Sequence, residues 1–327
     1  MVDTRKPDMN RNEAPGGSYT RPGDGIRGRF IDRRTKMLGI AAGLGAAAIW
    51  GGMYVVSKQV LEIVPPLTLV FLRVAIGTVT LAAIALVTRA PRVALRDLPF
   101  MALLGFIGLF ISMDVQFIGT KLSTAAYGAL ITSAVPAFLI LFAWPILGDK
   151  PTKRRIIGLV LATAGVIATI ALDARAQSEL ATETVHVLTG NVLLVLAAIT
   201  WALYSALSQV AARRYPVLIT TLYATGFGTV FNALVVPYDL SVNQIGEITL
   251  AVILGILYLG IVSTAGAFYL WNKSIALLGA SIPAILFFAQ PVVGGLLGAL
   301  LLNETLGLAF AVGGSLILLA VLITARE

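Results

Sequence analysis

The sequence predicts an all-α membrane protein with ten transmembrane helices arranged as two inverted five-helix repeats. Three observations lead to this prediction: the composition, the spacing of long apolar runs and an internal repeat. Of the 327 residues, 58% are hydrophobic and 12% are charged, whereas an average soluble protein carries about 25% charged residues. The mean hydropathy of +0.91 is an average over the whole chain, so a single anchor helix on a soluble domain cannot account for it.

The composition also excludes several kinds of chemistry. The chain has no cysteine and one histidine, so we expect no disulfide framework, thiolate nucleophile or metal cluster, and no cofactor. The histidine, His186, falls in a predicted outer loop, which makes a membrane-embedded transferase or hydrolase the less favoured class. There is no Gly-Lys-Ser or Gly-Lys-Thr phosphate loop, so ATP-driven transport is not expected.

Residues 1–36 are predicted to be a disordered basic cytoplasmic tail. They hold nine of the 24 basic residues among Gly, Pro, Asn and Asp, a composition that does not form a packed core. The first apolar run begins only after Lys36, so the tail does not resemble a secretory signal. Almost no aromatic residues lie between the charges, so we expect no nucleic-acid partner. We expect these basic residues to face the lipid surface and to set the orientation of the chain in the membrane.

The remaining chain divides into ten apolar segments wherever charge or Pro and Gly interrupt it. A membrane-crossing helix needs about 20 mostly apolar residues, and the runs are too long and continuous for barrel strands. The predicted segments are 37–57, 66–88, 98–119, 124–147, 154–172, 189–211, 217–237, 249–272, 278–302 and 306–325.

The distribution of positive charge predicts the orientation of these segments. With residue 1 in the cytoplasm, 20 of the 24 basic residues lie on the cytoplasmic side, three lie outside and Arg73 lies within a span. Because cytoplasmic loops attract Lys and Arg, we expect both termini inside, in a multi-pass protein of the cell (inner) membrane.

The two halves of the chain resemble each other. A shift of 151 residues places Trp50 on Trp201 and Ser57 on Ser208, and a shift of 155 places Pro136 on Pro291. Duplication of a unit with five helices, an odd number, inverts the second copy in the membrane, which is the plan of many secondary transporters. We expect a first repeat at 37–173, an external linker at 174–188 and a second repeat at 189–327.

The sequence resembles the EamA-type transporters of the drug/metabolite transporter superfamily. The matching stretches are AAIWGGMYVVSKQVLEIVPPLTLVFLR from Ala47, STAAYGALITSAVPAFLILFAWPILGDKPT ending at Thr152, AAITWALYSALSQ, and LLGASIPAILFFAQPVVGGLLGALLLNET. The resemblance implies ten helices, a central cavity between the halves and the movement of small metabolites, frequently export of amino acids or related compounds.

We therefore expect a secondary transporter that exports a small polar or amphipathic metabolite by alternating access. Its expected partners are the small-molecule substrate and the lipid bilayer, and coupling to protons is an open possibility. A passive facilitator or a lipid-carrier translocase of the same fold is the alternative, because a fold does not fix a function.

Candidate substrate-binding residues are polar or aromatic side chains at mid-span, which are costly to expose to lipid. Helical spacing places each group on one face of its segment, and two tryptophans could form walls around an apolar, aromatic or cationic group. Packing of the helices and interfacial aromatics remains the alternative. The candidates are Trp50, Tyr54 and Ser57 in the first segment, Trp201, Tyr204, Ser205 and Ser208 in the sixth, and Asp114, Tyr127, Tyr269 and Gln290 elsewhere.

Two charges and two prolines complete the prediction. Arg73 and Asp114 lie at similar depth in the second and third segments, so a buried ion pair is expected. Asp114 could instead bind a proton or the substrate. Pro136 and Pro291 remove a helical N–H at mid-membrane and are predicted to kink their helices.

Overall fold

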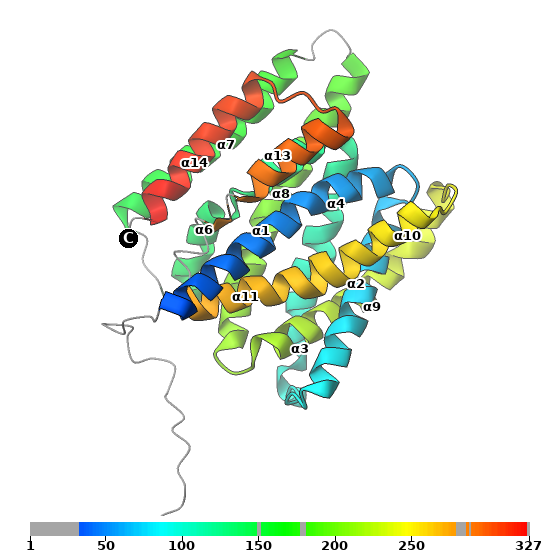
Figure 1. Ribbon diagram of the computed structural model, residues 1–327, viewed down its shortest axis with the longest axis vertical. Helices are drawn as coiled ribbons and strands as arrows, with labels where there is room; N and C mark the ends of the chain where they lie inside the picture. The colour runs from blue at the N-terminus through cyan, green and yellow to red at the C-terminus, as the bar shows by residue number, and fades with distance from the viewer. Residues whose placement is uncertain (1–32, 149–151, 177–180, 279–285, 288, 326–327) are drawn as a thin grey trace, which may run out of the picture. The chain divides into compact units, whose positions relative to one another are not determined.

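The computed structural model describes residues 33–148, 152–176, 181–278, 286–287 and 289–325 (Figure 1). Within these ranges the chain is helical, without a β-strand. The α-helices are α1 (Arg33–Leu61), α2 (Pro66–Val87), α3 (Leu98–Leu104), α4 (Ser112–Leu122), α5 (Ala125–Thr132), α6 (Val135–Leu147), α7 (Lys153–Ala176), α8 (Ala181–Ala212), α9 (Val217–Val242), α10 (Leu250–Leu257), α11 (Ala267–Leu278), α13 (Ala289–Leu302) and α14 (Leu308–Ala325).

Each of the ten predicted segments contains one or more of these helices. Six helical stretches in the described part are long and apolar enough to cross a membrane, and three further helices are apolar but shorter. The long stretches are Arg33–Leu61, Pro66–Val87, Leu95–Leu122, Val185–Ala212, Val217–Val242 and Leu250–Trp271. The protein is therefore a multi-pass membrane protein.

The helices extend beyond the predicted boundaries. α7 continues to Ala176 and α8 begins at Ala181, so most of the expected linker at 174–188 is helical apart from residues 177–180, which lie outside the described residues. This stretch holds three Ala, two Glu and two Leu, which are good helix formers. α1 likewise begins at Arg33, inside the expected tail, and residues 1–32 lie outside the described part.

The third segment of each half contains a π-helical stretch at an equivalent position. In the first half η2 (Gly105–Ile111) joins α3 to α4, and in the second half η3 (Tyr258–Gly266) joins α10 to α11. A shift of 155 residues places Gly105 on Gly260, so the two stretches coincide in the repeat. A π-helical turn carries more residues than an α-turn, and such turns are frequent at functional sites.

Each π-helical stretch packs closely against the second helix of the other half. A Cβ on Gly228 in α9 would lie 2.4 Å from Leu109 Cβ, and a Cβ on Gly77 in α2 would lie 2.5 Å from Thr264 Cγ2. The shift of 151 residues places Gly77 on Gly228, and the shift of 155 residues places Leu109 on Thr264. The two contacts are therefore equivalent in the repeat. Only glycine fits at either position, since it allows the backbones to approach.

α2 and α9 meet at a hydrogen bond between equivalent residues. Thr78 Oγ1 and Thr229 Oγ1 lie 3.1 Å apart and are separated by 151 residues in the sequence. Two equivalent groups can touch only where the symmetry axis passes between them. The local two-fold axis therefore runs between α2 and α9 at this pair.

Neighbouring helices bring segments that are distant in the sequence together around α1 and α8. α1 lies against α11 and α13, α8 lies against α4, α5 and α6, and α7 lies beside α14 (Figure 1). The residues of α1, α4, α8, α11 and α13 therefore converge on one region of the protein.

The two prolines lie at helix starts. α5 ends at Thr132 and α6 begins at Val135, one residue before Pro136, whose side chain lies outside the described residues. Pro291 is buried in the first turn of α13. A proline is tolerated in the first turn because its N–H would lack a helical acceptor there, so the kink at each position stays a prediction.

The close approach at Gly228 predicts a large difference between two neighbouring substitutions. Gly228→Ala should lower the thermal unfolding midpoint of the detergent-solubilised protein, because overpacking costs roughly 1–3 kcal/mol. Gly226→Ala is the matched control, since a Cβ there would be 3.9 Å from its nearest neighbour, Thr78 Cγ2, and alanine favours a helix. Equal midpoints for the two variants would contradict the packing described.

Candidate functional site

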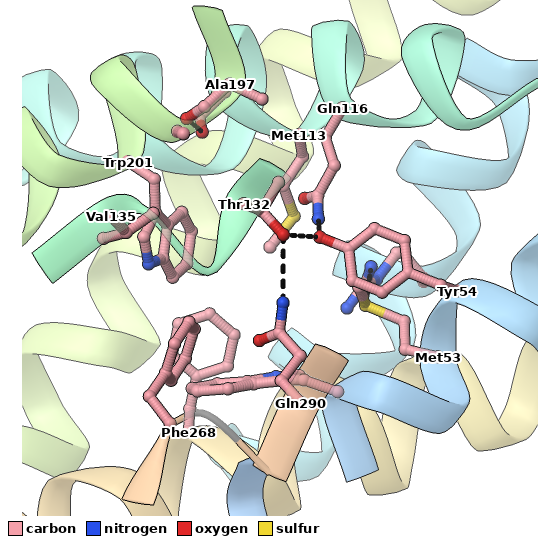
Figure 2. Close-up of a pocket in the computed structure, with 15 residues that line it drawn as sticks. Met53, Tyr54, Met113, Gln116, Thr132, Val135, Ala197, Trp201, Phe268 and Gln290 are labelled. Carbon is pink, nitrogen blue, oxygen red and sulfur yellow. Dashed lines mark hydrogen bonds between the residues drawn. The ribbon is translucent and has the colours of Figure 1, made fainter. Parts of the chain in front are cut away.

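A cavity of about 50 Å³ lies where helices of both halves converge (Figure 2). Residues from the first half and the second half contribute to its wall. The lining residues are Trp50, Met53, Tyr54, Arg73, Ser112, Met113, Gln116, Thr132, Val135, Ala197, Ala198, Trp201, Phe268, Phe287 and Gln290. This is smaller than a small-molecule pocket of about 300–1,000 Å³, so a substrate requires the wall to move apart.

The aromatic side of the cavity is formed by two tryptophans around a phenylalanine. Trp50 and Trp201, which are equivalent in the repeat, both line the cavity, and their ring centroids lie 5.6 and 5.4 Å from that of Phe268. Trp50 Nε1 donates a 3.1 Å hydrogen bond to Ser263 O in η3. Phe287 packs against Trp50 at 5.8 Å, so the indole is held in place on several sides.

The polar side of the cavity is a network of four side chains. Gln116 Nε2 donates to the Tyr54 hydroxyl, which bonds to Thr132 Oγ1 at 2.5 Å (Figure 2). Gln290 Nε2 donates to Thr132 Oγ1 at 2.9 Å and to Ala129 O at 3.2 Å. Thr132 Oγ1 in turn donates to Gly128 O, so its two lone pairs and one hydrogen are all used.

The network leaves amide oxygens for a ligand. A backbone carbonyl only accepts hydrogen bonds, so the bond from Gln290 to Ala129 O assigns the nitrogen of that amide to it. Gln116 and Gln290 both line the cavity. In the described part of the chain, the buried polar atoms that lack a partner do not include Oε1 of either residue. These two amide oxygens are the candidate acceptors for a ligand.

Arg73 is the charged member of the lining and is 1% exposed. Its Nε and Nη2 donate to Thr264 Oγ1 at 3.1 and 3.0 Å, and Nη2 also donates to Ser263 Oγ at 3.2 Å. Nη1 donates to Met53 Sδ at 3.1 Å, and the guanidinium carbon lies 5.0 Å from the ring centroid of Phe117. Neutral groups thus hold the cation.

The expected ion pair between Arg73 and Asp114 is wrong. No carboxylate of the described residues lies within ion-pair distance of Arg73, and Asp114 Oδ1 is buried without a hydrogen-bond partner. Similar depth along two helices does not fix the rotation of a side chain about its helix axis. The hydroxyls of η3 take the place that the carboxylate was expected to fill.

Several predicted substrate-binding residues do not line the cavity. The serines of α1 and α8 donate to backbone carbonyls of their own helices, as in Ser57 Oγ to Met53 O and Ser205 Oγ to Trp201 O. Tyr204 is buried against Gly108 of η2. The predicted residues outside the lining are Ser57, Asp114, Tyr127, Tyr204, Ser205, Ser208 and Tyr269.

Tyr269 is the clearest correction, because its side chain is 52% exposed. The prediction assumed one regular helix from 249 to 272. The π-helical stretch η3 interrupts that helix and rotates the residues after it relative to those before it. Phe268, the preceding residue, faces the cavity instead.

Gln116 and Thr132 are site residues that the sequence prediction missed. Gln116 lies four residues after Ser112, which also lines the cavity, so these two polar residues share a helix face. That spacing was a usable signal. Thr132 was hidden in an apolar run, and its contact with the Tyr54 hydroxyl depends on the packing of α5 against α1.

Polar contacts join different helices at both ends of the stretch from η1 (Leu95–Asp97) to α4. At its start, the Tyr215 hydroxyl donates to Asp97 Oδ2 at 2.7 Å. At its end, Lys58 Nζ donates to the carbonyl oxygens of Thr120, Lys121 and Ser123.

Glu304 accepts hydrogen bonds from the first two amides of α5, Ala125 N and Ala126 N, at 2.7 and 2.9 Å. Lysine at a helix C-terminus and glutamate at an N-terminus both complement the helix dipole. The junction between α4 and α5 is thus held from α1 on one side and from the segment after α13 on the other.

Comparison with known proteins places this architecture in a family. The model of the EamA-like transporter family matches residues 37–171 and 188–326. The "Uncharacterized transporter YetK" of Bacillus subtilis is 26% identical over 291 residues, which are 85% of this chain and 86% of that protein. The "Probable terminal-alkyne amino-acid exporter" of Streptantibioticus cattleyicolor is 28% identical over 227 residues, covering 69% and 72% of the two chains.

The fold also resembles a solved structure. A protein crystal structure matches with a TM-score of 0.61 over 90% of this chain and 99% of that chain, at 22% sequence identity. Similarity at this identity supports the helical fold and carries no information on the substrate.

The separation of Arg73 from Asp114 predicts a double-mutant cycle without coupling. Asp114→Asn should leave the unfolding midpoint and the amount of inserted protein unchanged or higher, because Arg73 does not depend on Asp114 as a partner. Arg73→Gln should lower both, and the double variant should equal the sum of the single effects within about 0.5 kcal/mol. If the double variant instead recovered inserted protein, that result would support an ion pair between the two residues.

Proposed function

Because the chain belongs to the EamA-like transporter family, we propose that it exports a small metabolite, an amino acid or a related polar or amphipathic compound, by alternating access. The observation that carries the proposal is the cavity whose wall is shared by both halves. A movement of one half against the other changes access to such a site without dismantling it. The family makes the protein a transporter and not an enzyme.

The lining provides what a small amphipathic compound needs. Trp50, Trp201 and Phe268 offer apolar and aromatic surface, while the amides of Gln116 and Gln290 offer hydrogen-bond acceptors. Few polar groups in a largely apolar pocket are typical of ligand sites. The named amino-acid exporter among the relatives supports this class of substrate.

The contacts at the two ends of the η1–α4 stretch are suited to control access. Under our proposal, opening toward one side breaks the bonds of Lys58 and Glu304 at the α4–α5 junction. Opening toward the other side breaks the bond between Asp97 and Tyr215. We propose that the first group faces outside and the second faces the cytoplasm, with ten spans and both termini inside.

Coupling to protons belongs to the same proposal. Asp114 is 6% exposed, and no arginine of the described residues lies within ion-pair distance of it, so we propose that its carboxyl group gains and loses a proton. A passive facilitator of the same fold is the alternative. Uptake into inverted membrane vesicles against a concentration gradient, with and without a protonophore, distinguishes the two.

Transport should depend on Trp201 far more than on an exposed tryptophan. We expect Trp201→Ala to reduce transport by roughly tenfold or more, because truncating a central aromatic contact removes a large share of binding energy. The measurement is efflux of labelled amino acids from an overexpressing strain, normalised to inserted protein. Trp144→Ala is the control, since Trp144 in α6 is 56% exposed.

Equal activity per molecule in both variants would make Trp201 a packing residue and would argue against the cavity as the transport site. Loss of inserted protein in Trp201→Ala alone would indicate a structural role. Trp50→Ala tests the equivalent wall, and it should behave like Trp201→Ala.

The orientation can be tested directly because the chain has no cysteine. Cysteines introduced at Arg96 and Arg213 should resist an impermeant thiol reagent in intact cells, while those at Glu62 and Gln244 should react. All four side chains are exposed, so access to the reagent depends on the side of the membrane. The reverse labelling pattern would overturn the proposed orientation.

A further inference from the structure

The charge of the cavity points to the kind of substrate it takes. Of its 15 lining residues, Arg73 alone carries a full charge. We propose that the substrate carries a carboxylate that pairs with Arg73, and that the cavity excludes organic cations. This inference rests on the proposed transport function and narrows its substrate class.

The donors of Arg73 are only partly used by strong acceptors. Nε and Nη2 are occupied by the hydroxyls of Ser263 and Thr264. Nη1, in contrast, meets the thioether of Met53, and sulfur is a weak acceptor. A carboxylate oxygen at this position would replace the weak contact with a charge-assisted hydrogen bond.

The positive charge of Arg73 is not neutralised locally. Its partners among the described residues are hydroxyls, a thioether and the ring of Phe117. Leaving a guanidinium without a counter-charge in a buried site is unfavourable, and a carboxylate from the substrate provides the missing charge. A cation without a carboxylate would be repelled by Arg73, although the aromatic walls would attract it.

The remaining wall restricts the rest of the molecule. The aromatic surface of Trp50, Trp201 and Phe268 accommodates an apolar or aromatic side group. The amide oxygens of Gln116 and Gln290 accept hydrogen bonds from an ammonium or another N–H donor. A zwitterionic amino acid with an apolar side chain satisfies all three features.

The alternative is that Arg73 only fixes η3 against α2 through its bonds to Ser263 and Thr264. Both roles predict loss of activity when Arg73 is replaced, so activity alone does not separate them. The choice of ligand does, because a purely structural arginine gives no preference for a carboxylate.

The experiment compares matched compounds on the purified full-length protein in detergent. Leucine, methionine and phenylalanine are each tested against their amides and against isopentylamine, 3-(methylthio)propylamine and phenethylamine, which lack the carboxylate. Thermal unfolding midpoints and quenching of tryptophan fluorescence report binding. We expect at least one amino acid to bind and to raise the midpoint, while its amide and its amine do not.

The Arg73→Met variant tests the residue itself. The affinity for the stabilising amino acid should fall by about tenfold or more, whereas the Arg92→Met control, an exposed arginine, should bind like wild type. Arg73→Lys should recover part of the affinity. If Arg73→Met fails to fold, the comparison of ligands on the wild-type protein still decides the question.

Two results would overturn the inference: binding of the amines as tightly as the amino acids, or no binding of any of the amino acids. Transport of an amine in the efflux assay would leave the transport function intact and refute only the carboxylate pairing. Absence of transport for every compound would contradict the proposed function itself.

Discussion

The hydrogen bonds made by η3 hold both the aromatic wall and the buried cation of the cavity. Ser263 O accepts from Trp50 Nε1, while the hydroxyls of Ser263 and Thr264 accept from Arg73. A backbone polar group inside a membrane must find a partner within the protein. Trp50 from α1 donates to one such backbone group, Ser263 O, within the π-helical stretch.

The π-helical stretch of the first half also accepts a hydrogen bond from a side chain of another helix. Leu109 O in η2 accepts from Asn232 Nδ2 in α9, so the π-helical turn is again joined to another helix by a polar side chain. By the shift of 155 residues Leu109 corresponds to Thr264 and not to Ser263, so the two halves share the kind of contact and not its position. In the first half the bond fixes packing between helices, whereas in the second half it positions the residues that face the cavity.

The sequence predicted the helical segments and the tryptophans of the cavity, and it failed where the helices are irregular. Length and apolarity are sufficient to locate a span, and the repeat placed Trp50 and Trp201 at equivalent positions, both of which line the cavity. The π-helical turns alter the rotation of the residues around them, and no periodicity reveals them in advance. The predicted role of Tyr269 failed because of the π-helical stretch before it. The expected contact of Asp114 with Arg73 failed because depth along a helix does not fix the rotation of a side chain about the helix axis.

A symmetric frame encloses an asymmetric cavity. The shift of 155 residues relates Gln116 to Trp271 and Thr132 to Phe287, so the first half supplies polar groups where the second half supplies aromatic rings. A ligand with one polar and one apolar end therefore has a single favourable orientation, whichever side it enters from.

The hydrogen bond between Thr78 and Thr229 has a consequence for motion. If two equivalent halves exchange their conformations, each contact away from the two-fold axis is traded for its counterpart, but a pair on the axis is mapped onto itself. The bond between these threonines then survives the exchange unchanged. α2 and α9 would then stay in contact as a stationary pivot, and the helices on either side would rotate about this pair.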